Sequence, residues 1–187
     1  MGKGSAQQNP NPEEEKVSNT PRIYVACLAS YNRGNLHGAW IDADRGAWAI
    51  WDGIKAMLAR SPVSGAEEYA IHDYEGFGAV RLAEYACVET VAETADFLMK
   101  HGEVGAELLA YYGGDLAEAR DAISDHYCGC HASLADYVQE LTEDVVEIPE
   151  TLKFYIDWEA MARDAEMSGD LFAIEIGYGQ VHVFATQ

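Results

Sequence analysis

The sequence predicts an α+β fold in which short strands come first and last and acidic helices fill the middle. Near residue 25, and again after residue 171, apolar residues follow a pattern typical of strands. Between these stretches apolar residues recur every three to four positions, which indicates amphipathic helices. The chain has 187 residues, of which 49% are hydrophobic, so it can form one ordinary domain or two to three small ones.

The first third of the chain predicts a small antiparallel sheet with one packed helix. Residues 1–21 are rich in Gln, Asn, Pro and Glu and are expected to form a disordered tail. After them, Trp48, Trp51, Ile54 and Leu58 follow helical spacing, and the helix is expected to end before Pro62. The expected elements are a strand at 23–28, a turn at 32–35, a strand at 36–41, a helix at 47–59 and a strand at 68–74.

The middle of the chain predicts a series of acidic helices beyond a joint at Phe77, which lies between two glycines. The clearest is expected over residues 81–101, with Glu84, Glu89, Glu93 and Asp96 away from its apolar face. Shorter helices are expected at 103–112, 115–124 and 134–141. The apolar face of the first helix is predicted to contain Leu82, Tyr85, Val88, Val91, Ala92, Ala95, Leu98 and Met99.

The last part of the chain predicts helices followed by a β-hairpin. A helix over residues 157–167 is expected to end at Ser168 and Gly169, a sequence typical of a helix C-terminus. Phe172, Ile174 and Ile176 then alternate with other residues, and a turn at 177–180 precedes a second apolar run.

Negative charge is concentrated in one region. Residues 62–170 contain 25 of the 32 acidic residues but only five of the 12 basic ones, and the whole chain has a net charge of −20. A sequence pI near 4.4 disfavours binding to nucleic acid or to an anionic membrane. The expected partner is therefore basic, and the alternative is that the acidity serves solubility alone.

The helical acids suggest how such a surface could be used. Residues four apart on a helix are separated by about 6 Å along its axis, and duplex DNA has one charge per about 1.7 Å of axis. Several acidic helices side by side can therefore approximate the charge density of a phosphate backbone. The helical faces predict that this surface includes Glu89, Glu93, Asp96, Asp115, Glu118, Asp121 and Asp125.

Other residues give weak signals for chemistry. His126, Cys128, Cys130 and His131 invite a zinc site, but Cys-x-Cys is shorter than the usual ligand spacing and no second pair follows. No glycine-rich phosphate loop or nucleophile motif is present. We expect no catalytic residue, no metal and no cofactor. The polar first 20 residues and the four cysteines favour a cytoplasmic protein, and no apolar run is long enough for a membrane span.

Several stretches match a known family. They include IYVACL at 23–28, LHGAWIDA at 36–43 and EYAIHDYEGF at 68–77, with shorter matches at 31–32, 82–85, 155–159 and 162–164. From about Pro21 to Gln187 the chain resembles the ArdA antirestriction proteins of mobile genetic elements. Cys128-Gly-Cys130 departs from the expected pattern, so a role for these thiols is not inherited, and residues 1–20 look like an extension.

The resemblance implies an elongated, dimeric α+β protein of three small domains, here expected at residues 22–77, 78–125 and 126–187. It implies an acidic surface that mimics bent duplex DNA and occupies the DNA-binding groove of type I restriction-modification enzymes, without catalytic residues. By match, this surface includes Asp73, Glu75, Glu84, Asp157, Glu159 and Asp164.

Two alternatives stay open. The chain could be an acidic module that sequesters another basic DNA-binding protein, such as a repressor or a nucleoid protein. It could also be a metal- or cysteine-dependent enzyme that uses Cys128 and Cys130. Replacing both thiols with serine tests the enzyme hypothesis. Unchanged antirestriction activity in this variant would remove its main support.

Overall fold

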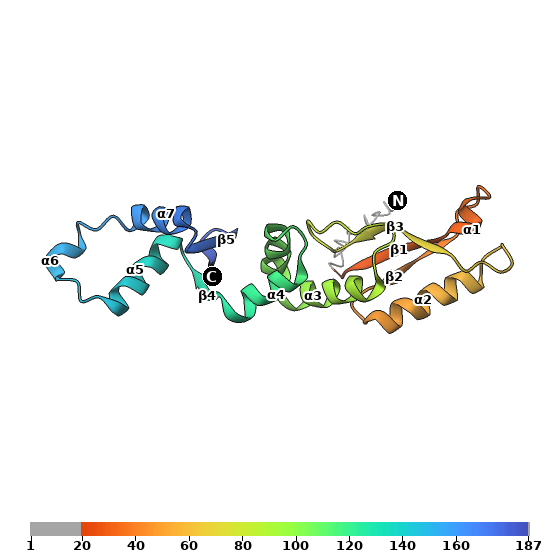
Figure 1. The fold of residues 1–187 in the computed structure, drawn as a ribbon, viewed down its shortest axis with the longest axis horizontal. Coiled ribbons are helices and arrows are strands. Elements are labelled where there is room, and N and C mark those ends of the chain that lie inside the picture. Colours follow the sequence, from red (N-terminus) through yellow and green to blue (C-terminus); the bar gives the residue numbers. More distant parts are fainter. Residues whose placement is uncertain (1–19, 187) are drawn as a thin grey trace, which may run out of the picture.

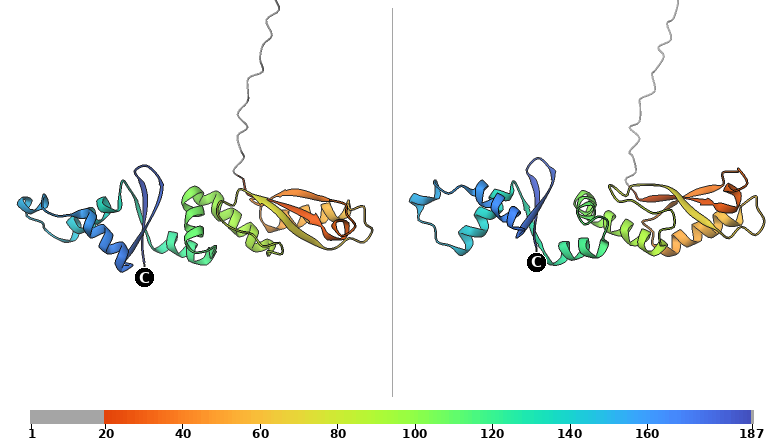
Figure 2. Two further views of the ribbon diagram at one scale, coloured as in Figure 1. Left: turned by 90° about the horizontal axis from the view of Figure 1, so that it is seen from above. Right: turned by 45° about the horizontal axis from the view of Figure 1, so that its top comes forward.

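The computed structural model describes residues 20–186, and these form an elongated body in every view (Figures 1 and 2). The described residues contain seven helices and two antiparallel sheets of three strands each. This mixture confirms the predicted combination of helices and small antiparallel sheets. Most of the expected N-terminal tail lies outside the described residues. Pro21, however, is fully buried and accepts a hydrogen bond from Ala43 N, so it belongs to the folded body.

The first sheet has the order β2-β1-β3 and is covered by one long helix (Figure 1). Helix α2 was predicted at its observed bounds, and Ile50, Ile54 and Met57 are its buried residues. Strand β2 begins at Gly38, two residues later than expected. A Cβ at Gly38 would lie 2.5 Å from the carbonyl oxygen of Val25, so only glycine permits this pairing distance. The elements are β1 (Arg22–Cys27), α1 (Leu28–Tyr31), β2 (Gly38–Asp42), α2 (Ala47–Ala59) and β3 (Tyr69–Glu75).

Helix α3 (Val88–Tyr111) begins seven residues later than the helix expected from residue 81, so that prediction was wrong at its start. The amide of Ile71 donates to the carbonyl oxygen of Glu84 at 2.8 Å, which ties this non-helical segment to the edge strand β3. Tyr85 and Met99, expected on the buried face, are 70% and 52% exposed. Gly102 breaks the helical geometry, so the two helices expected on either side of it are two halves of α3.

The second sheet has the order β4-β6-β5 and contains more than the predicted hairpin. Residues 127–131, which lie outside the strands expected from the sequence, form β4 and pair with β6 across a bulge between Tyr127 and Gly129. Pairing with β6, which is distant in the sequence, determines that this segment forms a strand, since Cys-Gly-Cys has little strand propensity of its own. The remaining elements are α4 (Leu116–Asp125), β4 (Tyr127–His131), α5 (Leu134–Val145), α6 (Glu150–Lys153), α7 (Trp158–Ser168), β5 (Leu171–Gly177) and β6 (Gln180–Ala185).

One hydrophobic core runs through most of the body. It joins Ile23 and Ile71 of the first sheet to Leu98 and Leu108 of α3, and it reaches Phe184 of the second sheet. A smaller cluster beneath α5 and α7 contains Val138, Ala162, Leu171 and Val183. The main core has no break at the expected boundaries after residues 77 and 125, and the division into three domains stays a prediction.

Candidate functional site

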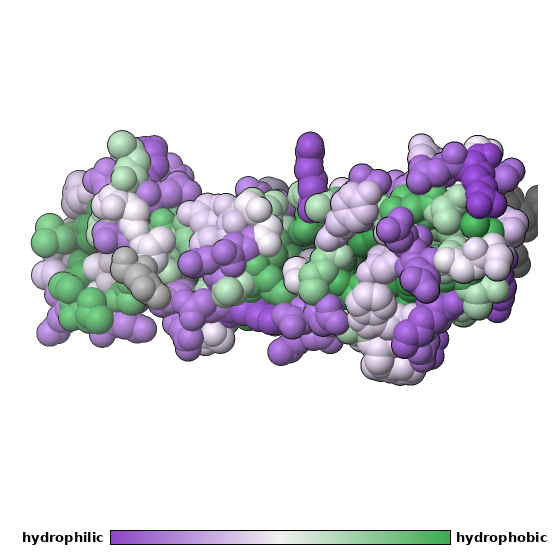
Figure 3. Space-filling model, turned by 45° about the vertical axis from the view of Figure 1, so that its right-hand side comes forward, coloured by the Kyte–Doolittle hydropathy of each residue, from purple (hydrophilic) through white to green (hydrophobic). Residues whose placement is uncertain are grey.

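The thirteen acids predicted from the sequence lie in three groups along the long axis (Figure 1). We call them together the carboxylate surface. Twelve are exposed and Asp121 is half-buried. Hydrophilic residues occur along the whole length of the face drawn in Figure 3. The groups are Asp73, Glu75 and Glu84 at β3 and the loop after it; Glu89, Glu93, Asp96, Asp115, Glu118, Asp121 and Asp125 at α3 and α4; and Asp157, Glu159 and Asp164 at α7.

The first group lies at the edge of the N-terminal sheet. Asp73 and Glu75 are two residues apart on β3, so their side chains leave the same face of the strand. Arg22 is the register partner of Glu75 and donates to Glu75 Oε2 from Nη2 at 2.6 Å and from Nε at 2.9 Å. Glu84 Oε1 lies 3.7 Å from His72 Nε2. Arg22 therefore compensates part of this group's negative charge.

Glu89 starts the acidic face of α3 and is held by two donors. The Cys87 thiol donates to Glu89 Oε2 at 2.8 Å, and the Trp51 indole N–H donates to Oε1 at 3.1 Å. These hydrogen bonds, that of Cys87 first, lower the pKa of Glu89 because they stabilise its charged form. The carboxylate is thus fixed in position and stays ionised at lower pH than an ordinary glutamate.

Glu93 follows Glu89 by one turn and is bridged to the next helix. Its Oε2 lies 3.0 Å from Nη1 of Arg120 on α4, and both side chains are about half exposed, at 57% and 46%. Two like charges at i,i+4 disfavour an isolated helix. In the structure each of these carboxylates has a partner from elsewhere in the chain.

Helix α4 brings two predicted acids together. Glu118 and Asp121 line a cavity of about 450 Å³ with Tyr112 and His126, between α4 and the end of the second sheet. Asp121 Oδ2 lies 3.4 Å from His126 Nε2. Burial raises the pKa of Tyr112, and the charges of Tyr111, Glu118 and Asp121 raise it further. Glu118 and Asp121 therefore generate a local negative potential in a concave part of the surface.

Two members of the carboxylate surface also cap helices. Asp115 Oδ1 accepts from the amides of Ala117 and Glu118 at the start of α4, and Asp157 Oδ1 accepts from Ala160 N at the start of α7. These carboxylates have a structural role that Glu159 and Asp164, on the same helix as the second cap, do not share.

The caps give a stability prediction. We expect Asp115→Ala and Asp157→Ala each to lower the free energy of unfolding by about 1 kcal/mol, because each leaves helix N–H groups unpaired. Asp164→Ala, a helical acid exposed in α7, is the matched control and should change it by less than about 0.5 kcal/mol. Urea denaturation followed by circular dichroism measures all three. Equal losses in caps and control would contradict the assignment.

The two histidines of the 126–131 segment contact different helices. His126 faces Asp121 of α4, whereas His131 Nδ1 lies 3.5 Å from Glu140 of α5. Cys128 is half-buried and Cys130 is exposed. Within residues 20–186 no three Cys, His, Asp or Glu side chains are placed to hold a metal ion. In the same range, no helix is both long and apolar enough to cross a membrane.

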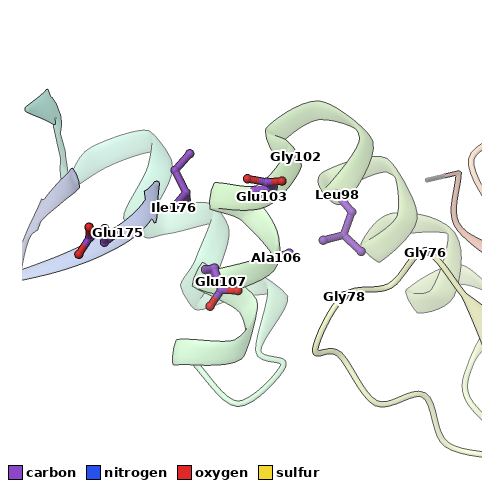
Figure 4. A pocket seen from close by; sticks show the side chains of 9 residues that line it. All are labelled: Gly76, Gly78, Leu98, Gly102, Glu103, Ala106, Glu107, Glu175 and Ile176. Atoms are coloured by element: carbon purple, nitrogen blue, oxygen red, sulfur yellow. The ribbon is translucent and has the colours of Figure 1, made fainter. Parts of the chain in front are cut away.

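Three further acids surround a cavity of about 370 Å³ at the kink of α3 (Figure 4). Glu103 and Glu107 come from the second half of α3 and Glu175 comes from β5. The i,i+4 spacing of the two helical acids could have indicated them from sequence. Glu175 follows no such pattern, because it reaches the cavity through the packing of β5 beside α3.

Comparison with known proteins adds one finding. The family model described as antirestriction protein (ArdA) matches residues 23–180, which is most of the described body. No curated protein matches the chain.

Proposed function

The chain belongs to the ArdA family of antirestriction proteins, and we propose that it inhibits type I restriction-modification enzymes by presenting the carboxylate surface in place of bent duplex DNA. The observation that carries the proposal is the distribution of that surface. Its three groups follow one another along an elongated body, from β3 through α3 and α4 to α7 (Figure 1). A groove that binds DNA contacts an extended row of charges, and such a surface offers one.

The proposed mechanism is occupancy. The family consists of inhibitor proteins that target restriction-modification enzymes, so the proposal assigns no bond-breaking step to any residue. Lysine and arginine side chains of the enzyme's groove would pair with exposed carboxylates. Glu89 would enter such a pairing with its carboxylate already held in place by the Trp51 and Cys87 donors. Protection of mobile-element DNA would follow from the blocked groove.

A homodimer is part of the proposal. Exposed apolar side chains at the α5–α6 end support it, since Val145, Phe154 and Tyr155 are 74%, 89% and 85% exposed. Exposed groups of this kind commonly mark protein contacts. Sedimentation equilibrium of the full chain tests the assembly, and a mass of one chain at micromolar concentration would count against it.

The test of the proposed function is inhibition of a purified type I enzyme acting on unmodified DNA. We expect stoichiometric inhibition at low salt and a weakening of roughly tenfold or more between 50 and 200 mM salt, because many exposed charges pair in the complex. Absence of inhibition, or inhibition independent of salt, would contradict the proposal. Recovery from lysate of a repressor or a nucleoid protein in place of the enzyme would favour the alternative of an acidic module for another DNA-binding protein.

A further inference from the structure

Helix α3 contains one residue whose backbone is not helical. Gly102 has φ 56° and ψ −136°, a region that residues with a side chain rarely adopt. The helix therefore bends between residues 88–101 and 103–111 (Figure 4). Nothing lies within 4 Å of a Cβ built on Gly102, so the backbone conformation, and not crowding, is what demands glycine.

The two halves of α3 pack against different elements. The first half packs against α2, to which Glu89 is tied through Trp51. The second half approaches the second sheet, where the Tyr111 ring stacks on Phe172 with centroids 4.3 Å apart and planes 5° apart. The bend at Gly102 therefore sets the orientation of Glu89, Glu93 and Asp96 relative to the acids further along the chain.

Two contacts brace the bend. On one side the loop after β3 lies close to the second half of α3, because a Cβ at Gly78 would be 3.0 Å from Ala106 Cβ. On the other side Arg120 reaches from α4, which follows the second half, back to Glu93 on the first half, at 3.0 Å. The ion pair thus connects elements on opposite sides of Gly102 across the kink.

We infer that Gly102 and Arg120 are positioning residues. They fix the angle between the part of the carboxylate surface that precedes Gly102 and the part that follows it, so that both parts fit one groove. The inference rests on the proposed function. The inference also explains why a basic residue lies within the acidic surface. Arg120 reduces the negative charge, but its ion pair across the kink holds the carboxylates in the positions that a partner would contact.

The first test is Gly102→Ala. Alanine is the best helix former and is strained in the positive-φ conformation of Gly102, so the two halves should join into a straighter helix. We expect small-angle X-ray scattering to show a changed maximum dimension, and inhibition of the type I enzyme to weaken about tenfold. A changed shape with undiminished inhibition would overturn the inference, and so would an unchanged shape with unchanged inhibition.

The second test separates position from charge. Arg120→Gln makes the chain more acidic, so charge alone predicts tighter inhibition, whereas loss of the brace predicts inhibition about threefold weaker. Arg120→Lys should restore most of it. Arg163→Gln on α7 is the charge-matched control and should not weaken inhibition. Tighter inhibition by Arg120→Gln would overturn the inference, even where Gly102→Ala fails to fold.

These outcomes are distinct from failure of the proposed function. A wild-type chain that inhibits no type I enzyme would remove the proposed function. The scattering of Gly102→Ala would still show whether Gly102 holds the bend, and an unchanged shape would overturn that part on its own.

Discussion

Replacing Glu89, Glu93 and Glu118 with glutamine and Asp121 with asparagine, all in one chain, is expected to abolish inhibition at concentrations where the wild type inhibits fully. An exposed ion pair contributes about 0.5–1 kcal/mol, so each single change should cost only a few-fold in affinity. Four such losses add to about 2–4 kcal/mol, which corresponds to a weakening of roughly 30- to 1000-fold. Titration of type I endonuclease activity with each variant measures the effect.

A matched control keeps the same net charge. Glu13, Glu14 and Glu15 changed to glutamine, together with Asp52→Asn, remove four charges outside the carboxylate surface. Inhibition by this variant should stay within about threefold of the wild type. Equal losses in the two quadruple variants would mean that total charge matters and position does not. Complete loss from Glu89→Gln alone, in a folded chain, would argue against a distributed surface.

Phe184→Ala is expected to cause the largest loss of stability, about 3–5 kcal/mol in the free energy of unfolding. Phe184 is fully buried, and its ring lies 4.9 Å from Phe172 and 5.2 Å from Tyr127, centroid to centroid. The loss is comparable to the whole stability of many domains of this size. Tyr178→Ala, at the fully exposed hairpin turn, is the control and should change stability by less than about 0.5 kcal/mol.

The same variant tests the division into domains. In a background in which Trp158 of α7 is replaced by phenylalanine, the remaining Trp40, Trp48 and Trp51 report on the N-terminal sheet and α2, whereas circular dichroism reports on all helices. Since Phe184 belongs to the core that includes Ile23, we expect both signals to shift together in urea. A tryptophan transition that stays at the wild-type midpoint would instead support an N-terminal unit that folds independently of the rest.

Local patterns predicted those parts of the fold that depend on local forces. The spacing of Trp48, Trp51, Ile54 and Leu58 predicts the bounds of α2 correctly, although Trp48 is 65% exposed and Ile50 is buried in the structure. The cap at Asp115 is also visible in the sequence. Residues 81–87 show the limit of such patterns. Their apolar spacing suits a helix, but a backbone hydrogen bond from Ile71 to Glu84 holds the segment against the edge of the sheet.

The candidate site, too, could be predicted from the sequence only in part. Helical periodicity accounts for the exposure of Glu118 and Asp125, which lie to one side of the buried Ala119 and Ala122 of α4, and Asp121 is half-buried. The partners of those acids do not follow from it. Arg120 is 27 residues from Glu93, and Trp51 is 38 residues from Glu89, so only the folded chain brings each pair together.

The elongated body has a consequence for the protein's own electrostatic self-energy. Like charges repel strongly only within a screening length of about 8 Å at physiological salt. In a long body the acids of β3 and those of α7 lie far apart (Figure 2), so each group repels mainly its own members. Elongation therefore lets the chain hold a dense local field at each group of the carboxylate surface, while the repulsion that opposes folding grows with the local density of acids and not with the full charge of −20.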